Sequence, residues 1–142
     1  MSAWAKPELN RYQRLMLAPS LDEQLGADCG VRRLDTLLRE LDWSEWEAPY
    51  AREGAGRPPI HPRLLAGCIL YGLLKGIRSM RGLEEATRLR LDFRWLLDAT
   101  AVDHTTLCVF RGRFEGKIGQ LFKQMGLVID NCYIIFHMEA QF

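Results

Sequence analysis

The sequence lacks an apolar stretch long enough to cross a membrane. Its longest apolar run, Leu64–Leu74, has eleven residues, whereas a transmembrane helix needs about 20, so the run predicts a buried helix. A signal peptide is lacking too, because Lys6, Glu8, Arg11 and Arg14 interrupt the region where an apolar block would stand. We therefore expect a cytoplasmic protein with no membrane partner.

Closely spaced metal ligands are also lacking. The four cysteines are Cys29, Cys68, Cys108 and Cys132, with no C-x-x-C pair among them. Zinc sites require ligands at short spacings, so the sequence predicts no metal site. In a reducing compartment such isolated cysteines are most simply buried thiols. His61 and His137 have no obvious partners in the sequence and are expected to be incidental.

The chain is long enough for one domain with a core, and its composition is that of a globular protein. It has 142 residues, of which 48% are hydrophobic and 26% charged, which argues against disorder. The net charge is only +1, but residues 62–118 carry ten Lys and Arg against six Asp and Glu. The positive charge therefore gathers around the stretch Ile77–Phe114.

Two stretches in the first half of the chain have helical periodicity. Val31–Trp43 carries an apolar stripe and predicts an amphipathic helix. The arginines expected to face outward from it are Arg32, Arg33 and Arg39. Arg63–Lys75 is apolar nearly all round, which indicates a central helix, and Pro62 and Gly76 suit its start and end.

Two further helices are predicted within the basic stretch. Ser79 stands just ahead of the periodic segment Met80–Arg90, and Asp103 stands ahead of a helix that begins at His104. Ser and Asp side chains accept hydrogen bonds from the first free amides of a helix, so both residues are predicted N-caps. Between the two helices, Asp92–Leu97 predicts one short apolar turn.

The remaining segments are expected to be irregular or extended. Residues 1–20 are expected to form an arm that packs against the domain, and residues 52–62, rich in Gly and Pro, predict a loop. An aromatic patch expected to cover the core consists of Trp43, Trp46, Pro49 and Tyr50, with a ligand-stacking surface as the alternative. Residues 127–136 are predicted to form a strand. The expected fold is all-α, a compact helical domain over residues 21–125 followed by a short, β-like C-terminal segment.

The two helices of the basic stretch outline a helix-turn-helix-like pair. The helix Ser79–Arg90 and the helix from Asp103 are joined by a compact connection, and the second helix begins with exposed Thr and His side chains. Such a pair presents short polar side chains to base edges and allows arginines to contact phosphates. A plain helical bundle remains the alternative.

Several motifs resemble the N-terminal domain of insertion-sequence transposases of the DDE type. That family shares the patterns G-R-P-x-x-x-P, L-L-Y-G-x-x-x-G-I-R-S, R-x-L-E-x-A, F-x-W-L and D-H-x-T-x-x-x-F-R. The corresponding residues are Gly56-Arg57-Pro58 with Pro62, Leu70-Tyr71-Gly72 with Gly76-Ile77-Arg78-Ser79, Arg81 with Leu83-Glu84 and Ala86, Phe93 with Trp95-Leu96, and Asp103-His104 with Thr106 and Phe110-Arg111. The resemblance covers about residues 12 to 125.

The resemblance implies a domain that recognises the terminal inverted repeats of a mobile element and is normally followed by an RNase H-like catalytic domain. That second domain would hold two Mg²⁺ ions with three carboxylates for strand cleavage and joining. In the family the first catalytic carboxylate follows an apolar strand. In this chain that position is either Asp130 or is occupied by Phe136. Glu139, further along, does not supply the two remaining carboxylates. We therefore expect residues 126–142 to be a truncated start of that domain. We expect this chain to hold no cofactor and to have no transposase activity alone.

Nine residues are candidates for contacting double-stranded DNA: Arg78, Arg81, Arg88, Arg94, His104, Thr105, Thr106, Arg111 and Arg113. The arginines are candidates for phosphate contacts, and the His and Thr side chains for base edges. Structural alternatives remain for each, namely a solvated surface for the arginines and an ion pair of Arg81 with Glu84 or Glu85. Thr106 has a helix cap or a buried hydroxyl as its alternative.

Two functions are consistent with the sequence. The first is a DNA-binding domain that recognises terminal inverted repeats in transposition. The second is a helical interaction module, which would form a homodimer or pair with a full-length transposase, or else an inactive pseudogene product.

Overall fold

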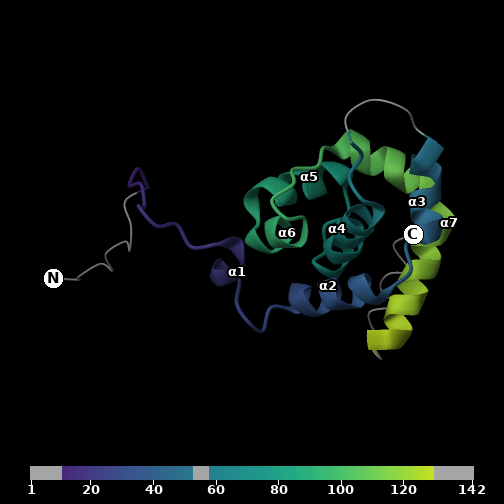
Figure 1. Cartoon of the computed structure of the whole chain (residues 1–142), viewed down its shortest axis with the longest axis horizontal. Helices are drawn as coiled ribbons and strands as arrows, with labels where there is room; N and C mark the ends of the chain where they lie inside the picture. Colours follow the sequence, from purple (N-terminus) through teal and green to yellow (C-terminus); the bar gives the residue numbers. More distant parts are fainter. Residues whose placement is uncertain (1–10, 53–57, 130–142) are drawn as a thin grey trace.

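The computed structural model describes residues 11–52 and 58–129, with side chains over 11–51 and 58–125. In these segments every regular element is a helix, which confirms the predicted all-α class. The elements are α1 (Leu21–Gln24), α2 (Gly30–Glu40), α3 (Ser44–Glu47), the 3₁₀ helix η1 (Ala48–Arg52), α4 (Pro62–Leu74), α5 (Met80–Leu89), α6 (Leu91–Leu96) and α7 (His104–Ile129). Figure 1 shows α4 in the middle of the domain, with the other helices around it.

Helix α4 forms the centre of the core, as its nearly all-apolar sequence predicts. Nine of its thirteen residues are buried, and it contacts α2, α5, α6 and α7. Two glycines bring neighbouring helices close, since a Cβ at Gly67 would lie 2.8 Å from Leu38 Cδ1 and a Cβ at Gly72 would collide with Leu83. The absence of these two side chains therefore sets the spacing of α2 and α5 against α4.

Three of the predicted helix ends, at Gly76, Ser79 and Asp103, are confirmed. Ser79 Oγ accepts a hydrogen bond from the Gly82 amide at 3.0 Å, and Asp103 Oδ1 accepts one from the Thr106 amide at 2.7 Å. Gly76 follows α4 in the left-handed conformation with φ 77°, which a glycine adopts without strain. Each signal is local, because it satisfies backbone groups within a few residues.

Helix α2 ends earlier than predicted, at Glu40. The reason is Trp43, whose indole Nε1 donates a hydrogen bond of 2.8 Å to the Leu38 carbonyl. This bond occupies one of the carbonyls that the end of a helix leaves free. Trp43 therefore caps α2 rather than extending it, and its buried ring joins the aromatic patch.

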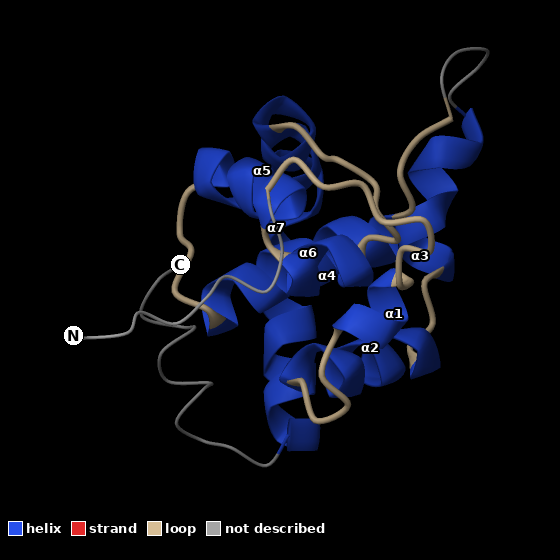
Figure 2. Ribbon diagram, turned by 90° about the vertical axis from the view of Figure 1, so that its left-hand side faces the viewer, coloured by secondary structure: helices blue, strands red, loops and turns tan. Residues whose placement is uncertain are grey.

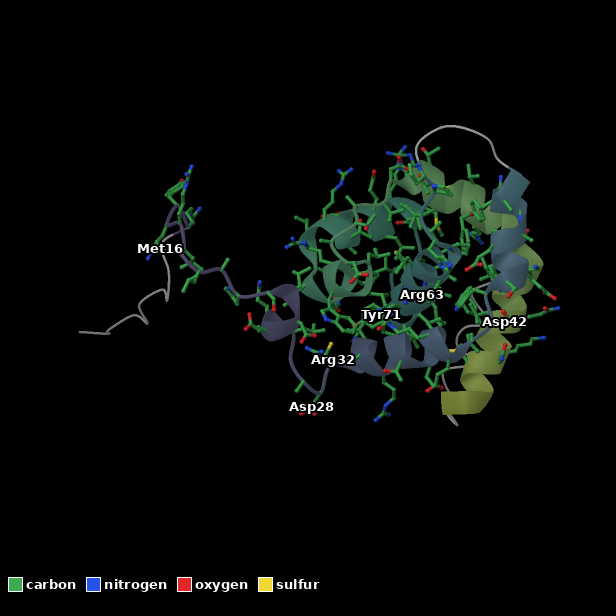
Figure 3. All side chains as sticks on the ribbon, in the orientation of Figure 1. Met16, Asp28, Arg32, Asp42, Arg63 and Tyr71 are labelled. Atoms are coloured by element: carbon green, nitrogen blue, oxygen red, sulfur yellow. The ribbon has the colours of Figure 1, made fainter. Side chains whose placement is uncertain are left out.

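Arg32 is not turned outward as predicted, because it joins three segments of the chain. Its guanidinium donates to Asp22 Oδ1 at 2.6 Å and to three backbone carbonyls, and it lies 5.1 Å from the centre of the Trp95 ring. Trp95 Nε1 donates to the same Asp22 carboxylate at 2.9 Å. The hydrogen bond from Arg32, followed by that from Trp95, lowers the pKa of Asp22 from its usual value. This cluster, whose Arg32 is labelled in Figure 3, connects α1 to α2 and α6.

Of the predicted loop over residues 52–62, residues 53–57 lie outside the described residues, while Arg52 ends η1 and Pro62 begins α4. His61, just before α4, is not incidental. His61 Nδ1 accepts a hydrogen bond from the Arg63 amide at 3.0 Å, which caps α4, and His61 Nε2 lies 2.6 Å from Glu47 Oε1. Because Nδ1 accepts, Nε2 carries the proton donated to Glu47. His61 thus joins α3 to the start of α4. His137 lies outside the described residues.

Residues 11–20 of the N-terminal arm do not pack against the domain, so the prediction is wrong for this part, and residues 1–10 lie outside the described residues. Residues 11–20 are all exposed, and Figure 1 shows them extending away from the helices. Their exposed apolar side chains are Tyr12, Leu15, Met16 and Leu17. The short helix α1 then begins at a capping box, in which Ser20 Oγ accepts from the Glu23 amide and Glu23 Oε2 accepts from the Ser20 amide.

Helix α7 is broken at Phe114. The backbone angles of this residue, φ −119° and ψ 22°, are not helical, and Figure 1 shows the two halves running in different directions. Figure 2 shows the described elements as helices joined by loops. The ring of Phe114 lies 5.0 Å from those of Trp46 and Phe110 and 6.3 Å from that of Tyr50. The aromatic patch therefore covers the core as predicted, and it also holds the break.

The second half of α7 continues further than expected. Lys117 Nζ donates to the Glu45 carbonyl at 3.2 Å and so fastens this half to α3. Residues 127–129 are helical, so the predicted strand does not begin there. The rest of that segment, with Asp130, Phe136 and Glu139, lies outside the described residues. Among the helices that the structure describes, none combines the length and apolar character needed to span a membrane.

Candidate nucleic-acid interface

The first half of α7, residues 104–113, presents one face to solvent. Leu107 and Phe110 lie on the opposite face and are buried in the core at 0% and 2% exposure. The residues that face away from the core are Thr105, Cys108, Val109 and Gly112, all exposed. We call these four residues the outward strip. It carries no charge, and its side chains are small.

One edge of the outward strip is bordered by two arginines. Arg111, which is half-buried, lies on α7, and Arg78, which is exposed, lies on the connection between α4 and α5. Both line a small hollow of about 40 Å³ whose other walls are apolar. The structure therefore brings together two of the predicted phosphate-contacting residues from segments more than thirty positions apart in the sequence.

The other edge of the strip is bordered by Arg113. Its guanidinium lies 5.1 Å from the centre of the Tyr50 ring, which draws the side chain away from the middle of the strip. Arg113, Thr105 and Thr106 line a second hollow of about 250 Å³, together with Tyr50, Pro59, Ile60, Leu65, Val109 and Phe110. Cationic groups thus stand on both sides of an uncharged helix face.

His104 is directed toward α5. Its Nδ1 lies 3.3 Å from Glu84 Oε2, and the other oxygen of the same carboxylate accepts from Arg88 at 3.3 Å. Glu84 therefore pairs with His104 and Arg88, and the ion pair of Arg81 with Glu84 that the sequence left open is not formed. His104 and Arg88, two of the predicted DNA-contacting residues, therefore share a carboxylate that ties the start of α7 to α5.

The other predicted arginines lie apart from the outward strip. Arg81 and Arg94 are exposed and line neither hollow, and within the described residues they form no ion pair. Arg90, their neighbour in the sequence, is held by both oxygens of Asp92 at 2.8 and 3.2 Å. The predicted group of nine residues therefore divides: Thr105 lies in the strip, Arg78, Thr106, Arg111 and Arg113 lie beside it, and the others lie elsewhere.

Asp92 also binds the Tyr71 hydroxyl, which donates to Oδ2 at 2.8 Å. Burial raises the pKa of Asp92, but the hydrogen bonds from Arg90, Tyr71 and the Phe93 amide outweigh this effect and lower it from its usual value. Burial, with the Asp92 hydrogen bond adding to it, raises the pKa of Tyr71. The cluster positions α6 against α4.

The connection between α5 and α7 contains α6, where the short apolar turn Asp92–Leu97 was predicted, followed by a tight turn. Asp98 and Ala99 follow α6 with φ 49° and 60°, a left-handed conformation that costs free energy for residues other than glycine. The turn is held by the buried Thr87, whose Oγ1 accepts from the Val102 amide at 3.5 Å and donates to the Glu84 carbonyl. The start of α7 is therefore positioned by α5 as well as by its own cap.

Sequence reasoning missed three of the four residues of the outward strip, namely Cys108, Val109 and Gly112. The helical spacing that identifies Leu107 and Phe110 as core residues also places these three on the opposite side. Cys108 is exposed, so it is not the buried thiol predicted, whereas Cys68 is buried and its burial raises the pKa of the thiol to about 12. Cys132 lies outside the described residues.

The described residues contain no group of three or more His, Cys, Asp or Glu side chains that would suit a metal ion. The comparisons with known proteins give one result. A family model described as a transposase domain (DUF772) matches residues 19–113, which is more than half of the chain and ends at the last residue before the break in α7. No curated protein and no solved structure matches the chain.

Proposed function

Because this chain belongs to the transposase domain (DUF772) family, we propose that it is a DNA-binding module that recognises the terminal inverted repeats of an insertion sequence. The observation that carries the proposal is the outward strip, an uncharged helix face with arginines at both edges. In the proposed complex the strip enters the major groove of double-stranded DNA. Arg78, Arg111 and Arg113 then contact phosphates on either side of the groove.

In this proposal the helix-turn-helix unit consists of α6, the turn at Asp98–Ala99 and the first half of α7. Helix α5 contacts this unit through Glu84, which pairs with His104, and through Thr87, which accepts a hydrogen bond from the Val102 amide. The assignment differs from the sequence-based pair, in which the helix Ser79–Arg90 came first. It is favoured by the short distance in sequence between α6 and α7 and by the cap that fixes the first turn of α7.

The test is fluorescence anisotropy with a terminal-repeat duplex and a scrambled duplex of equal length. We expect tighter binding to the repeat and an affinity that falls steeply as salt rises. Arg78→Gln and Arg113→Gln should each weaken binding on both duplexes and lower the salt slope by about one. Arg33→Gln is the matched control, because Arg33 is exposed on α2 and lines neither hollow. Equal affinity for the two duplexes would rule out specific recognition.

Cys108 provides an independent footprint of the interface. In a chain with Cys29→Ser and Cys132→Ser, the remaining thiols are the exposed Cys108 and the buried Cys68. We expect the terminal-repeat duplex to slow maleimide labelling of Cys108. Unchanged labelling at saturating DNA would show that the outward strip does not face the duplex, even if the protein binds DNA.

A second candidate function, pairing with another transposase chain, is favoured by the exposed arm. Leu15, Met16 and Leu17 are 48%, 101% and 91% exposed, and contiguous exposed apolar side chains are typical of interaction segments. The pairing should appear as a dimer in sedimentation equilibrium and should be lost on replacing these three residues with serine. A monomer at all accessible concentrations would exclude homodimer formation.

A further inference from the structure

The outward strip lacks every side chain that reads purines by paired hydrogen bonds. Proteins recognise guanine in the major groove chiefly with Arg or Lys, and adenine with Asn or Gln. The strip offers instead a threonine, a thiol, a valine and a glycine. The nearest long cationic side chains stand at its edges, where Arg113 lies over the Tyr50 ring and Arg111 lines the apolar hollow.

The strip offers apolar surface instead, at the part of the helix that would lie nearest the bases in the proposed complex. Val109 is 59% exposed although it is β-branched and apolar, and Thr105, whose side chain also carries a methyl group, is exposed on the same face one turn earlier. Among the four bases only thymine presents a methyl group in the major groove, and apolar side chains contact it there. The surface therefore matches thymine methyl groups in chemistry.

The dimensions of the strip agree with a short run of base pairs. From Thr105 to Gly112 the helix rises by about 10 Å, which corresponds to about three base pairs of duplex. Glycine at position 112 removes the last side chain from this face, so the backbone itself can approach the groove. A Cβ there would meet no atom of this chain within 4 Å, so packing within the domain does not require the glycine.

We infer that the outward strip reads thymine methyl groups in the major groove and so selects adjacent A·T pairs, with Val109 and Thr105 as the residues in contact. This inference rests on the proposed function. It goes further in naming the base that the strip recognises. The flanking arginines contribute affinity by phosphate contacts and do not determine the base at the centre.

The test uses a duplex that the protein selects from a randomised pool and the same duplex with deoxyuridine in place of thymidine. Deoxyuridine keeps the base pair and removes only the 5-methyl group. We expect the selected sequence to contain adjacent A·T pairs. Each contacted thymine replaced should then weaken binding by about fourfold, the value that corresponds to burying one methyl group. Replacing thymines outside the footprint should change nothing.

Val109→Ala links the effect to the strip. In this variant, deoxyuridine at one position should no longer weaken binding, because the partner of that methyl group is gone. Leu89→Ala is the matched control, since Leu89 is also apolar and exposed, at 73%, but lies on α5. The control should bind both duplexes as the unaltered chain does.

The outcomes separate the inference from the function on which it rests. A selected sequence whose affinity is unchanged by deoxyuridine, or whose centre is G·C, overturns the thymine inference and leaves specific DNA binding in place. Failure to select any sequence overturns the proposed function, and the inference falls with it. A deoxyuridine effect that Val109→Ala leaves intact shows that another part of the protein reads the methyl group, and it also overturns the inference.

Discussion

Replacing Gly112 with alanine should make the protein more stable and, at the same time, weaken its binding to DNA. Gly112 lies in the first half of α7, and a Cβ added there meets no atom within 4 Å, so no clash opposes the substitution. Gly116 lies in the second half of the same helix and is equally open. The two positions therefore form a matched pair that differs in its relation to the outward strip.

The expected gain in stability is the same at both positions. Glycine within a helix costs about 1 kcal/mol relative to alanine, and much of the gain comes from restricting the unfolded chain. We expect each substitution to raise the free energy of unfolding by about 0.5–1 kcal/mol, measured by urea denaturation with unchanged m-value. The midpoint of thermal unfolding should rise by about 2–5 °C.

The expected effect on DNA binding differs. A methyl group at position 112 would stand between the helix backbone and the floor of the groove, where overpacking costs about 1–3 kcal/mol. Gly112→Ala should therefore lower affinity by at least about fivefold, whereas Gly116→Ala should leave it unchanged. Equal affinities in two stabilised variants would refute close approach of the strip to DNA. A loss of stability in either variant would show that the space beside that glycine does not accept a methyl group.

Three further predictions concern the framework. Arg32→Lys should lower the free energy of unfolding, because lysine cannot keep the three carbonyl bonds and the charge-assisted bond to Asp22 at once, while Arg33→Lys should have no measurable effect in the same denaturation assay. Ala99→Gly should raise the free energy of unfolding by about 0.5–1 kcal/mol by relieving the left-handed backbone, and a decrease would mean that the turn carries no strain. The pKa of Asp92 is lower in the folded protein, so its carboxylate stabilises the fold above the unfolded pKa, and this contribution is lost as pH falls through the folded value. Asp92→Asn should therefore flatten the loss of stability in acid, as followed by circular dichroism, and an unaltered pH profile would contradict this assignment.

Much of the helical framework could be predicted from the sequence because its signals are local. Ser79, Asp103 and Gly76 act on backbone groups within three or four residues, and the structure places all three as expected. The capping box at Ser20 and Glu23 is an equally local signal, and applying the same rule there would have identified α1.

Features that depend on contacts between distant residues could not be predicted in this way. The break at Phe114 is held by Trp46 and Tyr50, more than sixty positions earlier, and nothing near Phe114 in the sequence marks it. Arg32 has the spacing of a solvent-facing residue, and only the folded chain brings Trp95 and Asp22 to it.

The candidate site was predicted in part. Charge and the exposed start of the second helix pointed to nine residues, and the structure gathers five of them on or beside one helix face. It also assigns His104 and Arg88 to a shared carboxylate. The centre of that face was missed because its residues are small and uncharged, so a search for charged and polar side chains passes over them.

The break at Phe114 also has a mechanical consequence. The half of α7 that precedes it is anchored to α5 through His104 and to the core through Leu107, whereas the half that follows is anchored to α3 through Lys117. The second half also enters the core, through Ile118, Leu121, Phe122 and Met125. The two halves of α7 are therefore fixed to the domain by separate sets of contacts, and the outward strip is positioned by those of the first half alone.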